Sequence, residues 1–258
     1  MALRVAIVGK GGAGKSVIAG TIARLVARQG RPVLALDSDT LPGLSLSLGS
    51  GPDVDVPPLQ AAAERDETGQ WRWTAGIDAQ LAAQRFATDA PDGVRLLQRG
   101  KIGPGGSPAI AAAGKAFWEV VHGIADAPAF ADWAMIGDLP AGPLHTAEDW
   151  APYAQTYVVV VQPGAQSALT ARRVARLARL RAPRARVAFI ANRVRGDEDV
   201  RHVERLIGEP VFGALPVDEC VAAAERIGVA PIDYAPDAPA IIAIERLVAD
   251  LVRAQGSS

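Results

Sequence analysis

The stretch GKGGAGKS, residues 9–16, decides the fold of this chain. It matches the pattern G-x-x-x-x-G-K-[ST] at every fixed position, directly after an apolar run and directly before an amphipathic stretch. Glycines let successive backbone N–H groups turn inward around phosphate oxygens, and the amino terminus of the following helix adds partial positive charge. The stretch therefore predicts a phosphate-binding loop, with contacts from Gly11, Gly12, Ala13, Gly14, Lys15, Ser16 and Val17.

Two side chains of this loop have predicted roles. The Lys15 ammonium reaches the β and γ phosphates, and the Ser16 hydroxyl is a ligand for Mg²⁺. The same residues also spell G-x-G-x-x-G, and Asp37 follows about 20 residues later, as a dinucleotide-binding fold requires. That alternative leaves Lys15 and Ser16 without a role, as does a purely structural glycine turn. We therefore expect a nucleoside triphosphate with Mg²⁺.

Beyond the loop, short apolar runs alternate with amphipathic stretches. Runs that predict strands are 3–8, 32–36, 94–97, 133–136, 157–161, 187–190 and 211–212. Stretches that predict helices are 16–28, 108–124, 166–181, 200–207, 219–227 and 239–253. Strands that are apolar on both faces and joined by helices form a mostly parallel sheet covered on both sides. We expect a doubly wound α/β fold with seven or eight strands.

The chain is expected to be one P-loop domain, residues 1–258, with one interruption. From about residue 49 to residue 92 the sequence is acidic, rich in proline, and carries Trp71 and Trp73. This segment breaks the alternation of strands and helices. It predicts a surface excursion, for which a hairpin is one option.

Composition and charge exclude several classes of protein. The 27 Lys and Arg residues nearly balance 28 Asp and Glu residues, which disfavours nucleic-acid binding through bulk charge. The single cysteine, Cys220, cannot form an internal disulfide or a cysteine-rich metal centre within one chain. No apolar stretch approaches the roughly 18 residues of a membrane span. We expect a cytoplasmic protein without a membrane partner.

Three aspartates are predicted to lie near the bound phosphates. Asp37 and Asp39 follow the expected strand 32–36, and residues two apart on an extended chain point the same way. One can hold the water shell of Mg²⁺ while the other orients the attacking water, with turn capping as the alternative. Asp138 follows the buried run 133–136, the expected place for a carboxylate linked to Mg²⁺ through water.

With Lys10 beside Lys15, the chain resembles the deviant Walker A ATPases, a group that includes MinD, ParA, the nitrogenase iron protein and the nickel-insertion ATPases of carbon monoxide dehydrogenase. The loop pattern of that group, K-G-G-x-G-K-[ST], is present as residues 10–16. The resemblance covers most of the chain. It extends to Asp37-x-Asp39, GDLPAG at 137–142, VVVVQPGAQS at 158–167, Asn192 and LPVD at 215–218.

The resemblance implies a homodimer that forms with ATP. In that group the extra lysine, here Lys10, reaches the partner's nucleotide, and the second switch aspartate, here Asp39, positions the hydrolytic water. Lys10, Lys15 and Asp39 are thus the implied catalytic residues. The implied magnesium site is Ser16, with Asp37 and Asp138 acting through water.

The identity of the base is predicted from Asn192, which follows the expected strand 187–190. Many GTP-binding proteins place an aspartate three residues after such an asparagine to pair with guanine, and Arg195 stands there instead. Adenine is therefore favoured. The resemblance implies that Asn192 and the loop residues Pro216, Val217 and Asp218 surround it, and an asparagine that only caps its turn is the alternative.

Differences from the group's pattern indicate which members of the group this chain resembles most. Local likeness around 94–100 and 162–169 is closest to the nickel-insertion ATPases, but the segment 101–108 lacks their Cys-x-Cys pair. The spacing of apolar residues in the last helix predicts core packing rather than a membrane anchor. Nucleic acid is a less favoured partner, because a solvated face is the commoner explanation for Arg172, Arg176 and Arg179.

Together these observations predict a Mg-dependent ATPase, slow and stimulated by a partner, that acts as a dimerisation switch on an unidentified client protein. Maturation of an enzyme or a metallocofactor is the leading role. A positioning or partitioning ATPase of ParA or MinD type is the alternative, and a nucleotide-gated scaffold without turnover is a third.

Overall fold

The central feature of the computed structural model, which describes residues 2–41, 43–51, 56–73, 76–102 and 106–256, is a twisted sheet. Within the described residues it has eight strands in the order β10-β9-β8-β1-β7-β2-β6-β5. All neighbouring pairs are parallel except β5 with β6. The mostly parallel α/β sheet is therefore confirmed. Its strands are β1 (Arg4–Gly9), β2 (Val33–Asp37), β5 (Thr88–Asp89), β6 (Val94–Gln98), β7 (Ala134–Asp138), β8 (Thr156–Val161), β9 (Arg186–Val194) and β10 (Gly213–Pro216).

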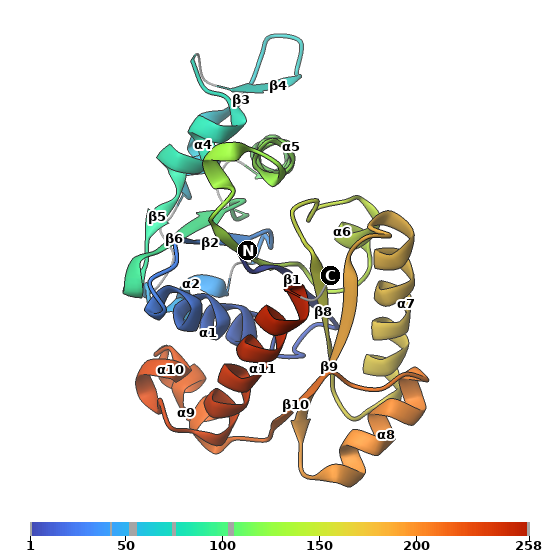
Figure 1. The fold of residues 1–258 in the computed structure, drawn as a ribbon. Coiled ribbons are helices and arrows are strands. Elements are labelled where there is room, and N and C mark those ends of the chain that lie inside the picture. The colour runs from blue at the N-terminus through green and yellow to red at the C-terminus, as the bar shows by residue number, and fades with distance from the viewer. Residues whose placement is uncertain (1, 42, 52–55, 74–75, 103–105, 257–258) are drawn as a thin grey trace.

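Helices cover both faces of this sheet (Figure 1). One face carries α1 (Lys15–Arg28), α2 (Leu44–Leu48) and α11 (Pro239–Gln255). The other carries α4 (Ala79–Phe86), α5 (Gly106–Ala125), α7 (Ala165–Arg181) and α8 (Asp197–Ile207). The remaining helices are α3 (Pro58–Ala62), α6 (Leu144–Ala147), α9 (Glu219–Ile227) and α10 (Pro231–Tyr234), with short 3₁₀ turns η1 (Pro91–Gly93) and η2 (Pro128–Phe130).

The two cores follow from the alternation of side chains along buried strands. In β1, Val5 and Ile7 point into the core under α1 and α11, whereas Ala6 and Val8 point into the core under α5 and α7. Every strand of the sheet centre is buried on both faces, which is the reason its sequence is continuously apolar. The carboxyl ends of β1, β2, β7, β8 and β9 consequently meet at one edge, where the phosphate loop leaves β1.

One predicted strand was misplaced. The run 211–212 is not a strand, and β10 begins at Gly213. The reason is local: the Val211 N–H donates to the Glu204 carboxylate of α8, 3.1 Å away, so that residue takes no part in the ladder with β9. The apolar side chains at 211–212 instead pack against the two cores from the sheet border.

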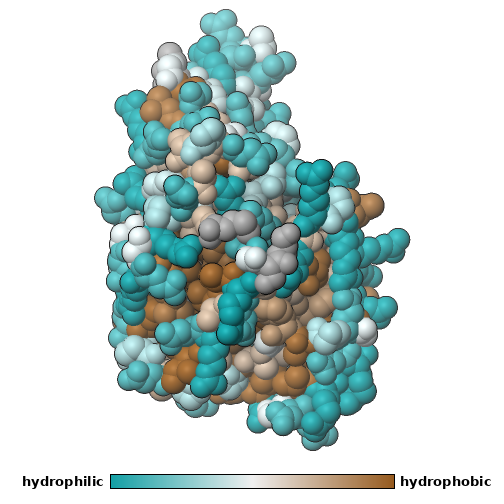
Figure 2. Space-filling view, in the orientation of Figure 1, coloured by the Kyte–Doolittle hydropathy of each residue, from teal (hydrophilic) through white to brown (hydrophobic). Residues whose placement is uncertain are grey.

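The segment 49–92 departs most from expectation. It does contain a hairpin, β3 (Ala63–Arg65) paired antiparallel with β4 (Trp71–Trp73), which projects at the top of Figure 1. It is not confined to the surface, however, because Leu59, Ala82 and Ala83 are buried in the main core and β5 extends the sheet. Its projecting tip is hydrophilic to neutral in Figure 2. Residues 52–55 and 74–75 of this prediction lie outside the described part of the chain.

Among the helices described, none combines the length and the apolarity that crossing a bilayer requires.

Candidate functional site

The phosphate loop connects Gly9 at the end of β1 to Lys15 at the start of α1. Gly14, the residue before the helix, has φ +93°, and a Cβ there would lie 2.5 Å from the Asn192 amide nitrogen. Gly12 also has a left-handed backbone, with φ +73°. Glycine is thus required at position 14 for two independent reasons, backbone conformation and close approach.

Two side-chain amides from neighbouring strands hold the outer side of the loop. Asn192 Nδ2 donates to the Ala13 carbonyl at 2.7 Å, and Gln162 Nε2 donates to the Gly12 carbonyl at 3.2 Å. Because these carbonyls are held by the amides, the loop has a defined backbone conformation before any phosphate arrives. Gln162 was not predicted as a site residue, although its place directly after the apolar run 157–161 could have indicated it.

The two loop lysines have different environments. Lys15 is buried, with 9% of its surface exposed, whereas Lys10 is half-buried at the rim. Lys10 Nζ donates to Gln166 Oε1 at the start of α7, 3.1 Å away. In the single chain, Lys10 is therefore held by its own subunit, outside the loop.

The carboxylates Asp37 and Asp138 are neighbours in the sheet, because β2 pairs with β7 in register at these two residues. Burial raises the pKa of Asp138 to about 6, although a hydrogen bond from the Ser16 hydroxyl and the charge of Lys15 lower it. Burial also raises the pKa of Asp37 well above its ordinary value, and the Asp138 charge raises it further. The fold thus places two carboxylates and a hydroxyl together beneath the loop.

This cluster fits a magnesium ion bound beside a triphosphate. Asp138 Oδ1 is buried and has no hydrogen-bond partner among the described residues. Oxygen donors of this kind are the ligands that Mg²⁺ prefers, and water commonly links the ion to carboxylates. Ser16, Asp37 and Asp138, the three residues predicted for magnesium, are therefore brought together.

Asp37 also closes the turn that follows β2. Its two carboxylate oxygens accept from the backbone N–H groups of Asp39 at 3.1 Å and Leu44 at 3.2 Å. Asp39 is half-buried and accepts from the Leu41 N–H at 3.1 Å. Both aspartates therefore cap the turn after β2, and their roles toward Mg²⁺ and water stay predictions.

The segment after β7 lies against the loop. The Gly142 N–H donates to the Gly9 carbonyl at 3.0 Å, and a Cβ on Gly11 would lie 3.5 Å from the Ala141 methyl group. Residues 139–143 are therefore placed to respond to an occupied loop.

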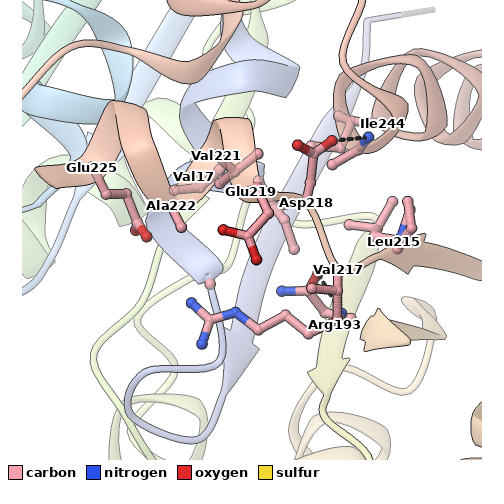
Figure 3. A pocket seen from close by; sticks show the side chains of 15 residues that line it. Val17, Arg193, Leu215, Val217, Asp218, Glu219, Val221, Ala222, Glu225 and Ile244 are labelled. Carbon is pink, nitrogen blue, oxygen red and sulfur yellow. Dashed lines mark hydrogen bonds between the residues drawn. The ribbon is translucent and has the colours of Figure 1, made fainter. Parts of the chain in front are cut away.

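Beside the loop a cavity of ≈ 280 Å³ opens between α1, α9 and the carboxyl end of β9 (Figure 3). Six predicted residues line it: Gly14, Val17, Asn192, Pro216, Val217 and Asp218. Lining residues that were not predicted come mainly from α9 and α11, and they are Ile18, Arg193, Leu215, Glu219, Val221, Ala222, Glu225, Ala240 and Ile244. The amphipathic character of the stretch 219–227 could have indicated the contribution of α9.

Asp218 lines this cavity but its carboxylate is already engaged. It accepts from the Cys220 N–H at the start of α9 and from the Ala240 N–H at the start of α11, both at 2.9 Å. Asp218 therefore fixes the walls of the cavity. Asn192 likewise bonds its own turn through the Arg193 N–H, at 2.9 Å, in addition to the loop.

The arginines predicted as a candidate DNA face lie elsewhere. Arg172, Arg176 and Arg179 are exposed on α7, and Arg179 pairs with Glu209 at 2.9 Å. They form no part of the phosphate-loop site.

Comparison with known proteins agrees with this geometry. Residues 5–232 match the model of the CobQ/CobB/MinD/ParA nucleotide binding domain. The carbon monoxide dehydrogenase accessory protein CooC of Rhodospirillum rubrum is 26% identical over 246 residues, which are 91% of each chain.

Two solved structures have a similar fold. The septum site-determining protein MinD of Pyrococcus horikoshii OT3, complexed with Mg-ADP, aligns with a TM-score of 0.74 and 21% identity over 99% of this chain and 98% of its own. A ParA family ATPase of Chlorobium tepidum TLS aligns with a TM-score of 0.72 and 21% identity, over 96% of this chain and 98% of its own. With the family model matching most of its length, the chain belongs to the CobQ/CobB/MinD/ParA nucleotide-binding domain family.

Proposed function

We propose that this protein is a Mg-dependent ATPase that dimerises around ATP and acts as a switch on a protein partner, in the maturation of an enzyme or a metallocofactor. The observation that carries the proposal is the arrangement of Lys15 and Ser16 against the buried pair Asp37 and Asp138, next to a cavity that is apolar enough for a purine.

Each residue has a role that follows from its place. The buried Lys15 ammonium pairs with the β and γ phosphates, and the loop N–H groups bind their oxygens. Bound Mg²⁺ would supply charge neutralisation between the phosphates, held by Ser16 and, through water, by Asp37 and Asp138. Asp39, at the rim, orients the attacking water and accepts its proton.

The apolar rim of the site supports a dimer that forms with ATP. Leu41, Leu144 and Leu169 are 78%, 58% and 49% exposed. They follow, in turn, the Asp39 turn, the segment after β7 and the start of α7 beside Lys10. Apolar side chains gathered around a charged pocket are typical of an interface. A second copy placed here covers them and brings its Lys10 toward the nucleotide.

The similarity to CooC over 91% of the chain favours a client enzyme that requires maturation. The alternative is a positioning ATPase, favoured by the exposed arginines of α7. Duplex DNA separates the two roles, since hydrolysis stimulated by DNA and abolished by high salt belongs to the alternative.

The direct test is ATP turnover and dimer formation by the Asp39→Ala variant. We expect binding of ATP and a persistent dimer, with turnover lost, because only the water-orienting carboxylate is removed. Asp78→Ala, at the cap of α4 and away from the loop, is the matched control and should keep turnover. Unchanged hydrolysis by Asp39→Ala contradicts the catalytic role, and negligible turnover by the wild type identifies a scaffold instead.

A further inference from the structure

A second cavity, of ≈ 370 Å³, lies between α5 and the residues that follow α6. Residues from three separate segments line it: Arg99, Ala111, Gly114, Lys115, Trp118, Glu148 and Trp150. None of them belongs to the phosphate loop or to the cavity beside it. Its lining is mainly aromatic and cationic, which indicates a ligand other than the nucleotide expected beside the phosphate loop.

Arg99 is the central group of this cavity. Its guanidinium lies over the Trp150 ring, 4.5 Å from the centroid, and its Nη1 atom lies 3.3 Å from His145 Nε2. Its Nε atom is buried and has no hydrogen-bond partner within the described part of the chain. A buried donor without a partner is costly, so the hydrogen-bonding capacity of Arg99 is not satisfied by these residues.

Among the described residues, Arg99 also has no ionic partner. No carboxylate oxygen of the residues described lies within 4.0 Å of its nitrogens. Burial lowers the pKa of Arg99, although the more distant charges of Asp39 and Glu148 raise it. A half-buried guanidinium in this state attracts an anion.

Gly114 lets α5 pack directly against one edge of the guanidinium. A Cβ on Gly114 would lie 2.6 Å from Arg99 Nη2 and 3.0 Å from Nε. The helix backbone therefore covers the edge formed by these two atoms. A carboxylate in the cavity meets Arg99 at its terminal Nη nitrogens, with charge-assisted N–H···O bonds.

The cavity continues into a hollow of ≈ 510 Å³ lined by Trp71, Lys115, Trp118 and Glu119. Trp118 is 40% exposed, although its indole N–H donates to the Glu148 carbonyl at 3.1 Å. The acidic groups of this surface already accept hydrogen bonds. The Trp73 indole donates to Glu119 at 3.2 Å, and the Trp150 indole donates to Glu148 at 3.3 Å.

We propose that the Arg99 cavity binds a glutamate or aspartate side chain of the client protein, with apolar residues next to it packed on Trp118 and Trp71. The two cations, Arg99 and Lys115, match such a carboxylate. The joined hollows have room for the residues on either side, which favours a protein segment over a free carboxylate. The proposal rests on the proposed function for the existence of a client.

The position of the cavity connects it to the nucleotide site. His145, in contact with Arg99, belongs to α6, which begins two residues after Gly142. The Asp39 charge acts on both Arg99 and His145. A carboxylate bound by Arg99 therefore lies next to α6, the helix that follows the Gly142 segment.

The test is a titration of the nucleotide-free, full-length protein, followed by tryptophan fluorescence. Trp71, Trp118 and Trp150 line the joined hollows and report occupancy directly. The probe is the blocked peptide acetyl-Leu-Glu-Leu-amide. Its neutral counterpart acetyl-Leu-Gln-Leu-amide tests the charge, and N-acetylglutamate tests a free carboxylate as the source.

We expect saturable binding of the glutamate peptide, and binding of the glutamine peptide weaker by about tenfold or more, as for hydrogen bonds to charged groups. Arg99→Gln should weaken binding of the glutamate peptide by a similar factor. Arg95→Gln, on β6, removes the ion pair with Asp89 of β5 and hydrogen bonds to the Gln84 and Ala87 carbonyls, and should leave peptide binding unchanged. Gly114→Ala should also weaken binding, because a Cβ 2.6 Å from Nη2 displaces the guanidinium from its place beside the cavity.

Other outcomes overturn the proposal. Equal affinity for the glutamate and glutamine peptides, or unchanged binding by Arg99→Gln, removes the carboxylate site. Equal affinity for the peptide and N-acetylglutamate contradicts a protein segment. Because no nucleotide is present, these results are independent of whether the protein hydrolyses ATP.

Discussion

The phosphate loop and the Arg99 cavity are built in opposite ways. The loop is a run of eight consecutive residues between β1 and α1, and the left-handed backbone at Gly12 and Gly14 gives it its shape. The Arg99 cavity is made of side chains from α5, from the end of β6 and from the segment after α6. The first is thus specified by local sequence. The second exists only because the fold brings distant side chains together.

Removing one lysine from each site should affect ATP affinity very differently. Lys15→Ala removes a buried ammonium from the phosphates, and we expect ATP affinity to fall by about a hundredfold or more. Lys115→Ala removes the same group from the second cavity and should leave ATP affinity unchanged. Isothermal titration calorimetry with Mg-ATP measures both. Similar losses in the two variants would show that the cavities are not independent.

The next effect tests the backbone of the loop. Gly14→Ala forces a side chain into φ +93° and toward the Asn192 amide, 2.5 Å away. We expect the free energy of unfolding to fall by about 1–3 kcal/mol from strain, with a further loss from the clash. Thermal unfolding measures the change.

Gly30→Ala is the control for that substitution. Gly30 has φ +77° but nothing within 4 Å of its Cβ position, so only backbone strain remains. If Gly14→Ala lowers the free energy of unfolding no more than Gly30→Ala does, the contact with Asn192 does not contribute to the loss.

The buried carboxylates give a dependence on pH. The pKa of Asp138 rises from 3.8 to about 6 on folding, so the folded state holds the proton more tightly. Stability from this group is present below pH 3.8 and is lost as the pH rises through about 6. In the absence of nucleotide and Mg²⁺, Asp138→Asn should therefore become more stable than the wild type across this window, by about 3 kcal/mol at most.

Urea unfolding between pH 4 and pH 7 measures this difference, with Asp132→Asn as the control on an exposed carboxylate. A difference that stays constant with pH, or one that shrinks as the pH rises, contradicts the raised pKa of Asp138.

Removing the Arg99 guanidinium should have the least effect on the nucleotide site. Arg99 does not line the nucleotide cavity, so Arg99→Gln should change ATP affinity by about twofold or less, as expected for sites without shared contacts. Calorimetry under the same conditions as for Lys15→Ala decides this. A tenfold loss would place Arg99 in the nucleotide site itself.

The fold was predictable where buried strands are apolar on both faces. Continuously apolar runs such as 157–161 fit few structures other than a buried strand, and the predicted bounds of β8 differ from the observed ones by one residue. The segment 49–92 was not, since α3, α4 and β5 are short and are stabilised by packing against α5 and β6 rather than by their own periodicity. The strand predicted at 211–212 was placed too early, because Glu204, seven positions before Val211, accepts the Val211 N–H and no sequence pattern shows this contact.

The site residues likewise fall into those that the sequence predicts and those that it does not. The loop, Asp37 and Asp138 were predictable because a motif and the carboxyl ends of strands determine their places. Gln162 and the α9 residues of the cavity were missed, since neither belongs to a motif. Arg99 was missed for a stronger reason: its partners, Gly114, His145 and Trp150, are at least 15 positions away in the sequence.

In the proposed function the phosphate loop serves two subunits, through Lys15 its own and through Lys10 its neighbour. Multi-angle light scattering with a non-hydrolysable ATP analogue and Mg²⁺ measures this. We expect the 26.8 kDa chain to double its mass, whereas Lys10→Ala should bind the analogue and remain a monomer. If Lys10→Ala dimerises as fully as the wild type, Lys10 does not serve the neighbouring subunit.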